Sequence, residues 1–122
     1  MKRNPEAWER SALAALLHGF YNGVENAFKM LAASRGGVPS SPDWHSVLLQ
    51  SMAAPAGSNR PVIERDLAFA LEEYMRFRHF FRHAYVFDLN WEKMKPLTEE
   101  LEGVFARFAA AVRAYLAAVP AS

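Results

Sequence analysis

The chain has 122 residues, a formal net charge of +1, 52% hydrophobic residues and no cysteine. A chain of this length hides roughly two-thirds of its unfolded surface, so we expect one domain over residues 1–122 with its own apolar core. The absence of cysteine excludes disulfides, thiolate metal sites and thiol nucleophiles. With 14 Lys and Arg against 13 Asp and Glu, any nucleic-acid site must be a local patch of positive charge.

The N-terminal residues lack the apolar core and small-residue cleavage site that are typical of a secretory signal. Further along the chain, no segment has the ~18 consecutive apolar residues that a membrane-spanning helix needs. We therefore expect a cytoplasmic protein with no membrane partner.

A first helix is expected over residues 5–34. Asn4 and Pro5 form a helix-start pattern, in which an N-cap side chain precedes a proline at the first helical position. Apolar residues then recur at spacings of three, four and their sums, which indicates an amphipathic helix. These residues are Trp8, Leu13, Leu16, Leu17, Phe20, Val24, Phe28 and Leu31.

Two Pro- and Gly-rich segments flank a short second helix. Residues 36–42 combine two glycines with two prolines, so the chain must turn there. Asp43 can cap a helix from Trp44 to about Ala53. Residues 54–61 then form a second loop, which we expect to be mobile.

Two more long helices follow. Residues 62–87 contain no Gly or Pro and carry an apolar stripe at helical spacing, with Pro61 in the first turn. A fourth helix is expected over residues 91–118, with Pro96 in or just after its first turn, or kinking it. No β-type alternation of useful length appears. The sequence therefore predicts an all-α, antiparallel up-down bundle of three long helices and one short one, in which the short helix could lie across the others.

Residues 76–85, Arg-Phe-Arg-His-Phe-Phe-Arg-His-Ala-Tyr, concentrate positive charge. Half of them are Arg or His in a chain that is almost neutral overall. Arginine offers planar bidentate donors to phosphate, histidine exchanges a proton near neutral pH, and aromatic rings stack on bases. Arg and His on a helix are often simply solvated, and cations favour the last turns of a helix. Here, however, the cations lack the interleaved acids of an ordinary solvated face.

The pattern Arg78-x4-His83-x-Tyr85 resembles the Arg-x(4–6)-His-x-Tyr motif of HepT-like ribonuclease toxins in the HEPN superfamily. The polar His79 directly after the arginine and the continuation over residues 87–91 also resemble this family. The chain length, the all-helical pattern and the place of the motif near the end of the penultimate long helix extend the resemblance over nearly the whole chain.

The resemblance implies a metal-independent RNA endonuclease that needs no cofactor and acts as a homodimer, with motif helices of two subunits forming one cleft. His83 would handle the proton of the attacking 2′-hydroxyl or of the leaving 5′-oxygen, and Arg78 would stabilise charge on the phosphate. Arg76, His79 and Arg82 would support RNA binding. The expected partner is a nucleotidyltransferase antitoxin. The alternatives are an inactive HEPN module that docks a nucleotidyltransferase or a nucleotide, and a structural bundle with a solvated basic face.

Helix geometry leaves the choice of arginine open. Five residues turn a straight helix by about 500°, so Arg78 and His83 point about 140° apart. Arg76 lies seven residues before His83 and shares its face, together with His79. Arg76 is therefore an alternative catalytic arginine or an RNA contact.

Other polar residues each have two interpretations. Tyr85 could be adenylylated, as the resemblance implies for some members, or could pack near a helix end. Glu25 could pair with an arginine of the motif helix or, more commonly, be solvated. His18 and His45 are expected at the boundary or the surface. His79 and His83 have metal-ligand spacing, but no Asp or Glu precedes a histidine by three residues, so we expect no metal site.

Overall fold

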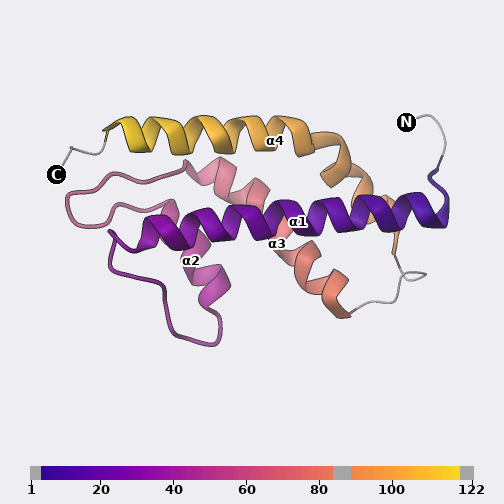
Figure 1. The fold of residues 1–122 in the computed structure, drawn as a ribbon, viewed down its shortest axis with the longest axis horizontal. Coiled ribbons are helices and arrows are strands. Elements are labelled where there is room, and N and C mark those ends of the chain that lie inside the picture. Colours follow the sequence, from indigo (N-terminus) through magenta and orange to yellow (C-terminus); the bar gives the residue numbers. More distant parts are fainter. Residues whose placement is uncertain (1–3, 84–88, 119–122) are drawn as a thin grey trace.

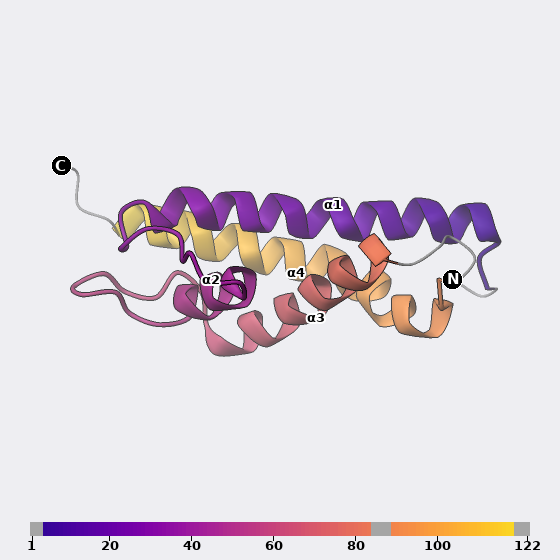
Figure 2. The ribbon, with the colours of Figure 1, turned by 90° about the horizontal axis from the view of Figure 1, so that it is seen from below.

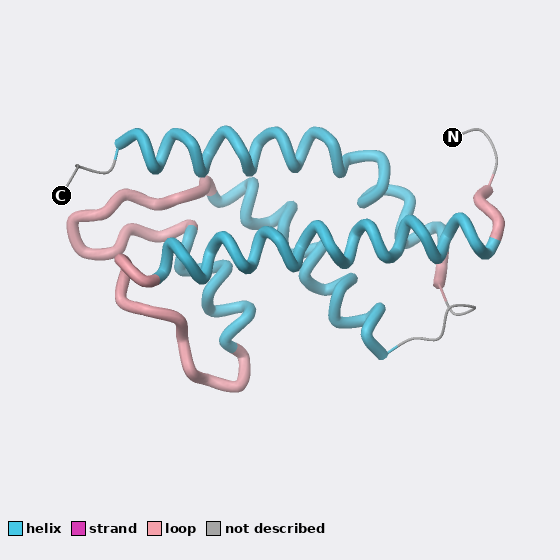
Figure 3. The backbone as a smooth tube through the Cα atoms, in the orientation of Figure 1, coloured by secondary structure: helices cyan, strands magenta, loops and turns pink. Residues whose placement is uncertain are grey.

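The computed structural model describes residues 4–83 and 89–118, without the side chains of Arg82 and His83. It has four helices, α1 (Ala7–Ala32), α2 (Trp44–Met52), α3 (Arg65–His83) and α4 (Trp91–Ala118) (Figure 1). Within these described ranges there is no β-strand, and the loops connect helices only (Figure 3). The prediction of an all-helical bundle is confirmed. No described helix is long and apolar enough to span a membrane.

The helices α1 and α3 hold the bundle together, because each of them contacts the other three helices. Figure 1 shows α1 and α4 running in the same direction along the long axis, while α3 runs obliquely in the opposite direction. The shorter α2 packs against α1 and α3. In the turned view of Figure 2, α2 and α3 lie on the same side of α1. This arrangement brings the middle of α1, the start of α2 and the second half of α3 together.

The core consists mainly of apolar and tyrosine side chains from all four helices. Its largest fully buried members are Tyr21, Tyr74, Tyr115, Phe28, Leu17, Leu48, Leu49, Met52, Leu71, Met94 and Val24. Not every large apolar residue of α4 belongs to the core, since 56% of Phe105 is exposed. Val104, one residue earlier, is turned by about 100° around α4 and takes the buried place. Phe105 instead lines a groove of about 460 Å³ between α1 and α4.

The start of α1 differs from the prediction. The helix begins at Ala7, so Asn4 and Pro5 lie before it. The N-cap is Glu6, whose backbone N–H donates to Glu9 Oε1 at 3.0 Å. A carboxylate three residues into the helix reaching back in this way satisfies one of the free N–H groups at a helix start. This local bond explains why the helix starts two residues later than expected.

The start of α3 also differs, because the helix begins at Arg65 and not at Val62. The N–H groups of Val62 and Ile63 both donate to the carbonyl of Met52, at 2.8 and 3.1 Å. Their side chains are buried. The segment after Pro61 therefore packs onto the end of α2, and this burial outweighs the helical pattern of its residues.

A single guanidinium group holds the loop between α2 and α3. Arg35 donates from Nη1 to the carbonyl of Arg60 at 2.7 Å and from Nη2 to the carbonyls of Ala54 and Ser51 at 2.6 and 3.3 Å. Nη1 also lies 3.2 Å from the hydroxyl of Tyr115. The loop that we expected to be mobile is thus attached at both of its ends.

Pro96 lies inside α4, where it removes one helical hydrogen bond. Figure 1 shows the first turns of α4 inclined to the rest of the helix. Next to the proline, the hydroxyl of Tyr74 on α3 donates to the carbonyl of Leu97 at 2.7 Å. Burial raises the pKa of Tyr74 to about 12. The hydroxyl therefore stays protonated and keeps α3 attached to the bend.

Candidate functional site

Arg78 points from α3 into the bundle and forms a bidentate ion pair with Glu25 on α1. Nη1 and Nη2 lie 3.1 and 3.0 Å from the two carboxylate oxygens, and Nη1 also donates to Asn22 Oδ1 at 3.1 Å. Arg78 and Glu25 are each only 5% exposed. The guanidinium carbon lies 4.9 Å from the centre of the Tyr21 ring, which adds a cation–π contact. Of the two interpretations of Glu25, the pairing with a motif-helix arginine is the one observed.

The carboxylate of Glu25 is kept ionised by its neighbours. Burial by itself raises the pKa of Glu25, but hydrogen bonds from Arg78 and His45 outweigh burial and hold the pKa below its ordinary value. A buried carboxylate with two such partners is stabilised in its charged form. It can therefore orient both partners at neutral pH.

His45, near the start of α2, is the third member of this cluster. Its Nδ1 lies 2.7 Å from Glu25 Oε2 and 3.1 Å from Arg78 Nη2. These two contacts make opposite demands on Nδ1, since the carboxylate calls for a proton there and the guanidinium for a lone pair. Because Glu25 is ionised and is the closer partner, we assign the proton to Nδ1, which then donates to the carboxylate. Trp44 stacks on the ring with centroids 3.7 Å apart, and Lys29 Nζ lies 4.9 Å from the Trp44 ring. His45 is partly buried, in line with the expectation of a boundary or surface residue, but its contacts with Glu25 and Arg78 were not predicted.

A pocket of about 540 Å³ opens beside this cluster. It is formed by the start of α2 and the second half of α3. Its lining residues are Pro42, Asp43, His45, Ser46, Met75, Arg76, Arg78 and His79. Three of the cationic residues predicted from the motif segment therefore meet one histidine from another helix at a single cavity.

The predicted site residues divide between the interior and the surface of α3. Arg78 is buried, whereas Arg76 and His79 are exposed. Arg76 donates to Glu72 and Glu73 at 3.0 and 2.9 Å. Helix geometry predicts this division. The side chains of Arg82 and His83, and Tyr85 as a whole, lie outside the described residues.

His45 is a residue that the sequence interpretation assigned to no function. It lies 33 residues from Arg78 and 20 from Glu25, and no pattern along the chain connects these positions. The available signal was weak: a glutamate among apolar neighbours of α1 needs a polar partner once its helix is packed. That signal points to Arg78 but not to His45.

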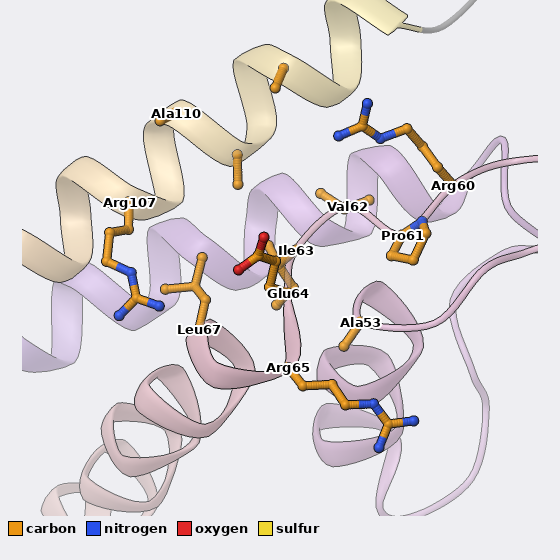
Figure 4. A pocket seen from close by; sticks show the side chains of 12 residues that line it. Ala53, Arg60, Pro61, Val62, Ile63, Glu64, Arg65, Leu67, Arg107 and Ala110 are labelled. Carbon is orange, nitrogen blue, oxygen red and sulfur yellow. The ribbon is translucent and has the colours of Figure 1, made fainter.

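Another pocket, of about 680 Å³, lies between the segment before α3 and α4 (Figure 4). Figure 4 shows Arg60, Arg65 and Arg107 on different sides of it, with guanidinium groups that do not converge. Arg107 is paired with Asp66 at 3.1 Å. This pocket is larger but contains no motif residue. The pocket beside His45 is therefore the better candidate.

A metal ion finds no ready site in the part of the chain that the structure describes, where no three His, Asp or Glu side chains converge. Glu25 and His45 are two potential ligands. Both carboxylate oxygens of Glu25 are already engaged by Arg78, and one of them also by His45. This cluster is therefore built to orient an imidazole and not to hold a metal.

The buried pair predicts a pH-dependent stability. Because the pKa of Glu25 is lowered from 4.5 in the folded state, the pair stabilises the fold above pH 4.5, and this contribution is lost as the pH falls through the lowered value. A Glu25→Gln variant is expected to be less stable than wild type at pH 7, and the difference should shrink below pH 4.5. Urea denaturation at a series of pH values measures it. A difference that stays constant with pH would contradict the ion pair.

Comparison with known proteins identifies the family of the chain. No curated protein and no solved structure gives a significant match. The sequence profile of a family described as HepT-like protein matches residues 12–119. The matched range includes Glu25, His45 and Arg78, and it spans all of α2, α3 and the motif segment. The chain belongs to the HepT-like family.

Proposed function

We propose that this protein is a metal-independent RNA endonuclease, the toxin of a pair with a nucleotidyltransferase antitoxin, formed by one HepT-like domain over residues 1–122. The observation that carries the proposal is the family match over residues 12–119, which includes the motif Arg78-x4-His83-x-Tyr85. Family membership supports an RNA-cleaving toxin. The catalytic residues, the reaction and the partners are part of this proposal.

In this proposal, His83 carries a proton to or from the reacting oxygen atoms of the RNA. Arg78 contributes positive charge at the pocket, which it lines from within the bundle. Its Nη atoms already contact Glu25, so Arg76 and His79 are better placed to bind the RNA backbone from the exposed face. Arg82 belongs to the same basic segment and is proposed to assist them.

We propose a homodimer in which the α3 helices of two subunits meet. An exposed face of α3 supports this arrangement. Phe69, Arg76 and Phe80 follow one another at spacings of seven and four residues, which places them on one side of the helix. Phe69 is 71% exposed and Phe80 is 43% exposed. Two large apolar side chains on the motif helix offer the contact area that a second copy would bury.

The nucleotidyltransferase antitoxin is proposed to act at Tyr85, by transferring a nucleotide to its hydroxyl group. The added phosphate would place negative charge beside the basic segment that binds RNA. This pairing would take place in the cytoplasm, where the RNA substrate is found.

A second candidate function is an inactive module that docks a nucleotidyltransferase or a nucleotide. The burial of Arg78 favours it, because both of its Nη atoms are engaged by oxygen atoms of α1. An arginine held in this way supports the shape of a docking surface as readily as it supports a reaction.

Cleavage of RNA with an excess of EDTA present tests the leading proposal. We expect the purified protein to cut a pool of cellular RNA and to leave 2′,3′-cyclic phosphate ends, since the 2′-hydroxyl is the nucleophile. Oligonucleotides of the same sequence with 2′-deoxyribose should not be cut. End-group mapping of the products measures both expectations.

The results of this experiment distinguish the two candidate functions. Intact RNA together with tight binding of a nucleotidyltransferase would support the docking module and contradict the ribonuclease. Cleavage of DNA and RNA at equal rates, or cleavage that EDTA abolishes, would contradict the proposed chemistry. RNA cleavage that survives EDTA and requires the 2′-hydroxyl supports the endonuclease.

A further inference from the structure

The arrangement around His45 is a carboxylate–histidine pair that opens onto a cavity. Nδ1 donates to the ionised carboxylate of Glu25 at 2.7 Å, so the neutral ring carries its lone pair on Nε2. Trp44 covers one face of the ring. The side chain of His45 is still 35% exposed. With Nδ1 engaged by Glu25 and one face stacked on Trp44, Nε2 is the ring nitrogen left to serve the pocket of about 540 Å³ that His45 lines.

We propose that His45 is the general base of this protein and takes the proton of an RNA 2′-hydroxyl group bound in the pocket. This inference rests on the proposed ribonuclease function and adds a residue that lies outside the motif. A histidine needs a fixed tautomer and a partner that stabilises its protonated form to act as a base. Glu25 fixes the tautomer through Nδ1, and its negative charge offsets the guanidinium of Arg78, whose Nη2 lies 3.1 Å from the same nitrogen.

The proposed reaction uses two histidines, one that removes a proton and one that supplies a proton. As Nε2 of His45 accepts the proton, the 2′-oxygen forms a bond to phosphorus and the bond from phosphorus to the 5′-oxygen breaks. The leaving 5′-oxygen takes a proton from His83, in the role that the proposed function gives to that residue. The product is a 2′,3′-cyclic phosphate. The assignment gives the two proton transfers to residues on different helices, α2 and α3.

Charged groups of both signs surround His45. On α1 these are Glu25, which accepts its hydrogen bond, and Lys29, which lies over Trp44. Arg78 of α3 lies against the ring itself, with Nη2 3.1 Å from Nδ1, while Arg76 and His79 of α3 line the pocket. Asp43, the residue before α2, also lines it, and Arg76 is paired with Glu72 and Glu73. Arginine side chains at the pocket suit a bound phosphodiester. The one carboxylate bonded to the ring is buried behind it, on the side away from the cavity.

The variant His45→Asn isolates the proton transfer. The asparagine amide can still donate to Glu25, but it offers no group that accepts a proton at neutral pH. We expect RNA cleavage to slow by about 100- to 10,000-fold with the Tm and the RNA affinity unchanged. The rise of the cleavage rate with pH on the acidic side should also disappear. Gln50→Ala, on the exposed side of the same helix, is the control and should cleave like wild type.

A substrate with a good leaving group separates the base from the acid. Nucleoside 3′-(4-nitrophenyl phosphates) with each of the four bases release a phenolate that needs no proton. On these substrates we expect His83→Ala to approach the wild-type rate, whereas His45→Asn should stay slow. If His45→Asn cleaves like wild type, the role of His45 is overturned and the ribonuclease stands. A wild-type protein that cleaves neither kind of substrate overturns both proposals.

The tautomer gives a test that does not need activity. In ¹⁵N spectra of the histidine-labelled protein, neutral His45 is expected to be protonated at Nδ1 and not at Nε2. His45→Asn identifies the signal by its loss. The opposite tautomer would overturn the role of His45 as base without any effect on the proposed function.

Discussion

Replacing Arg78 with methionine is expected to lower the free energy of unfolding by about 3–5 kcal/mol. The methionine fills much of the space but leaves the Glu25 carboxylate buried without its main partner. Glu25 is 5% exposed, so water does not replace the lost hydrogen bonds. Urea denaturation at pH 7 measures the change. For a chain of this size the Tm should fall by on the order of 10 °C or more.

The double variant Arg78→Met with Glu25→Leu completes the test. It removes both charges, so it should recover a large part of the stability that either single change loses. Arg76→Met is the matched control on the same helix. Arg76 is exposed and pairs with the exposed Glu73 and the partly exposed Glu72 at the surface of α3, so its replacement should cost about 1 kcal/mol or less. Equal losses of unfolding free energy for Arg78→Met and Arg76→Met would show that the buried ion pair stabilises the fold no more than the exposed pairs do.

Replacing His83 with alanine is expected to reduce RNA cleavage by about 100- to 10,000-fold, because the reaction loses one of its two proton-transferring groups. The free energy of unfolding should change little, since His83 is the last residue of α3 and helix ends contribute little to stability. Initial rates on RNA under single-turnover conditions measure the loss, and urea denaturation verifies the fold.

The neighbouring Arg82→Ala variant serves as the comparison for His83→Ala. It removes a cation proposed to bind the RNA backbone, so it should raise KM, more strongly at low salt, and leave kcat nearly unchanged. A His83→Ala variant that behaves in the same way would assign His83 to RNA binding. A His83→Ala variant as active as wild type would show that His83 is not a catalytic residue.

Most of the helical pattern could be predicted from the sequence, and the failures have local causes. The structure places α4 at Trp91–Ala118, the range that its periodicity and flanking residues indicate. For α3, the expected start at Val62 was wrong because Val62 and Ile63 gain burial and two hydrogen bonds from the end of α2. Helical periodicity describes neighbours along the chain, so it contains no information about that contact.

The candidate site was predictable only where its residues are close in sequence. Arg76, Arg78 and His79 stand out as a dense basic group, and helix geometry separates the buried one from the exposed ones. The link from Arg78 to Glu25 spans 53 residues and was one of two open interpretations. His45 enters the site through the packing of α2 on α1 and α3. His45 contacts Glu25 and Arg78 only when α1, α2 and α3 are packed together.

The attachment of the loop between α2 and α3 through Arg35 has a consequence for how this protein can vary. The acceptors on Ser51, Ala54 and Arg60 are all backbone carbonyls. Every amino acid supplies that group, so substitutions along the loop leave its anchorage intact as long as the backbone follows the same path. The requirement for a particular side chain is transferred to Arg35, outside the loop. Gly57, whose φ of 59° favours glycine, and Asn59, whose amide donates to the carbonyl of Ser34 at 3.4 Å, are exceptions within the loop. Its other side chains are free to change and to acquire new surface chemistry, while Arg35 still holds both ends of the loop.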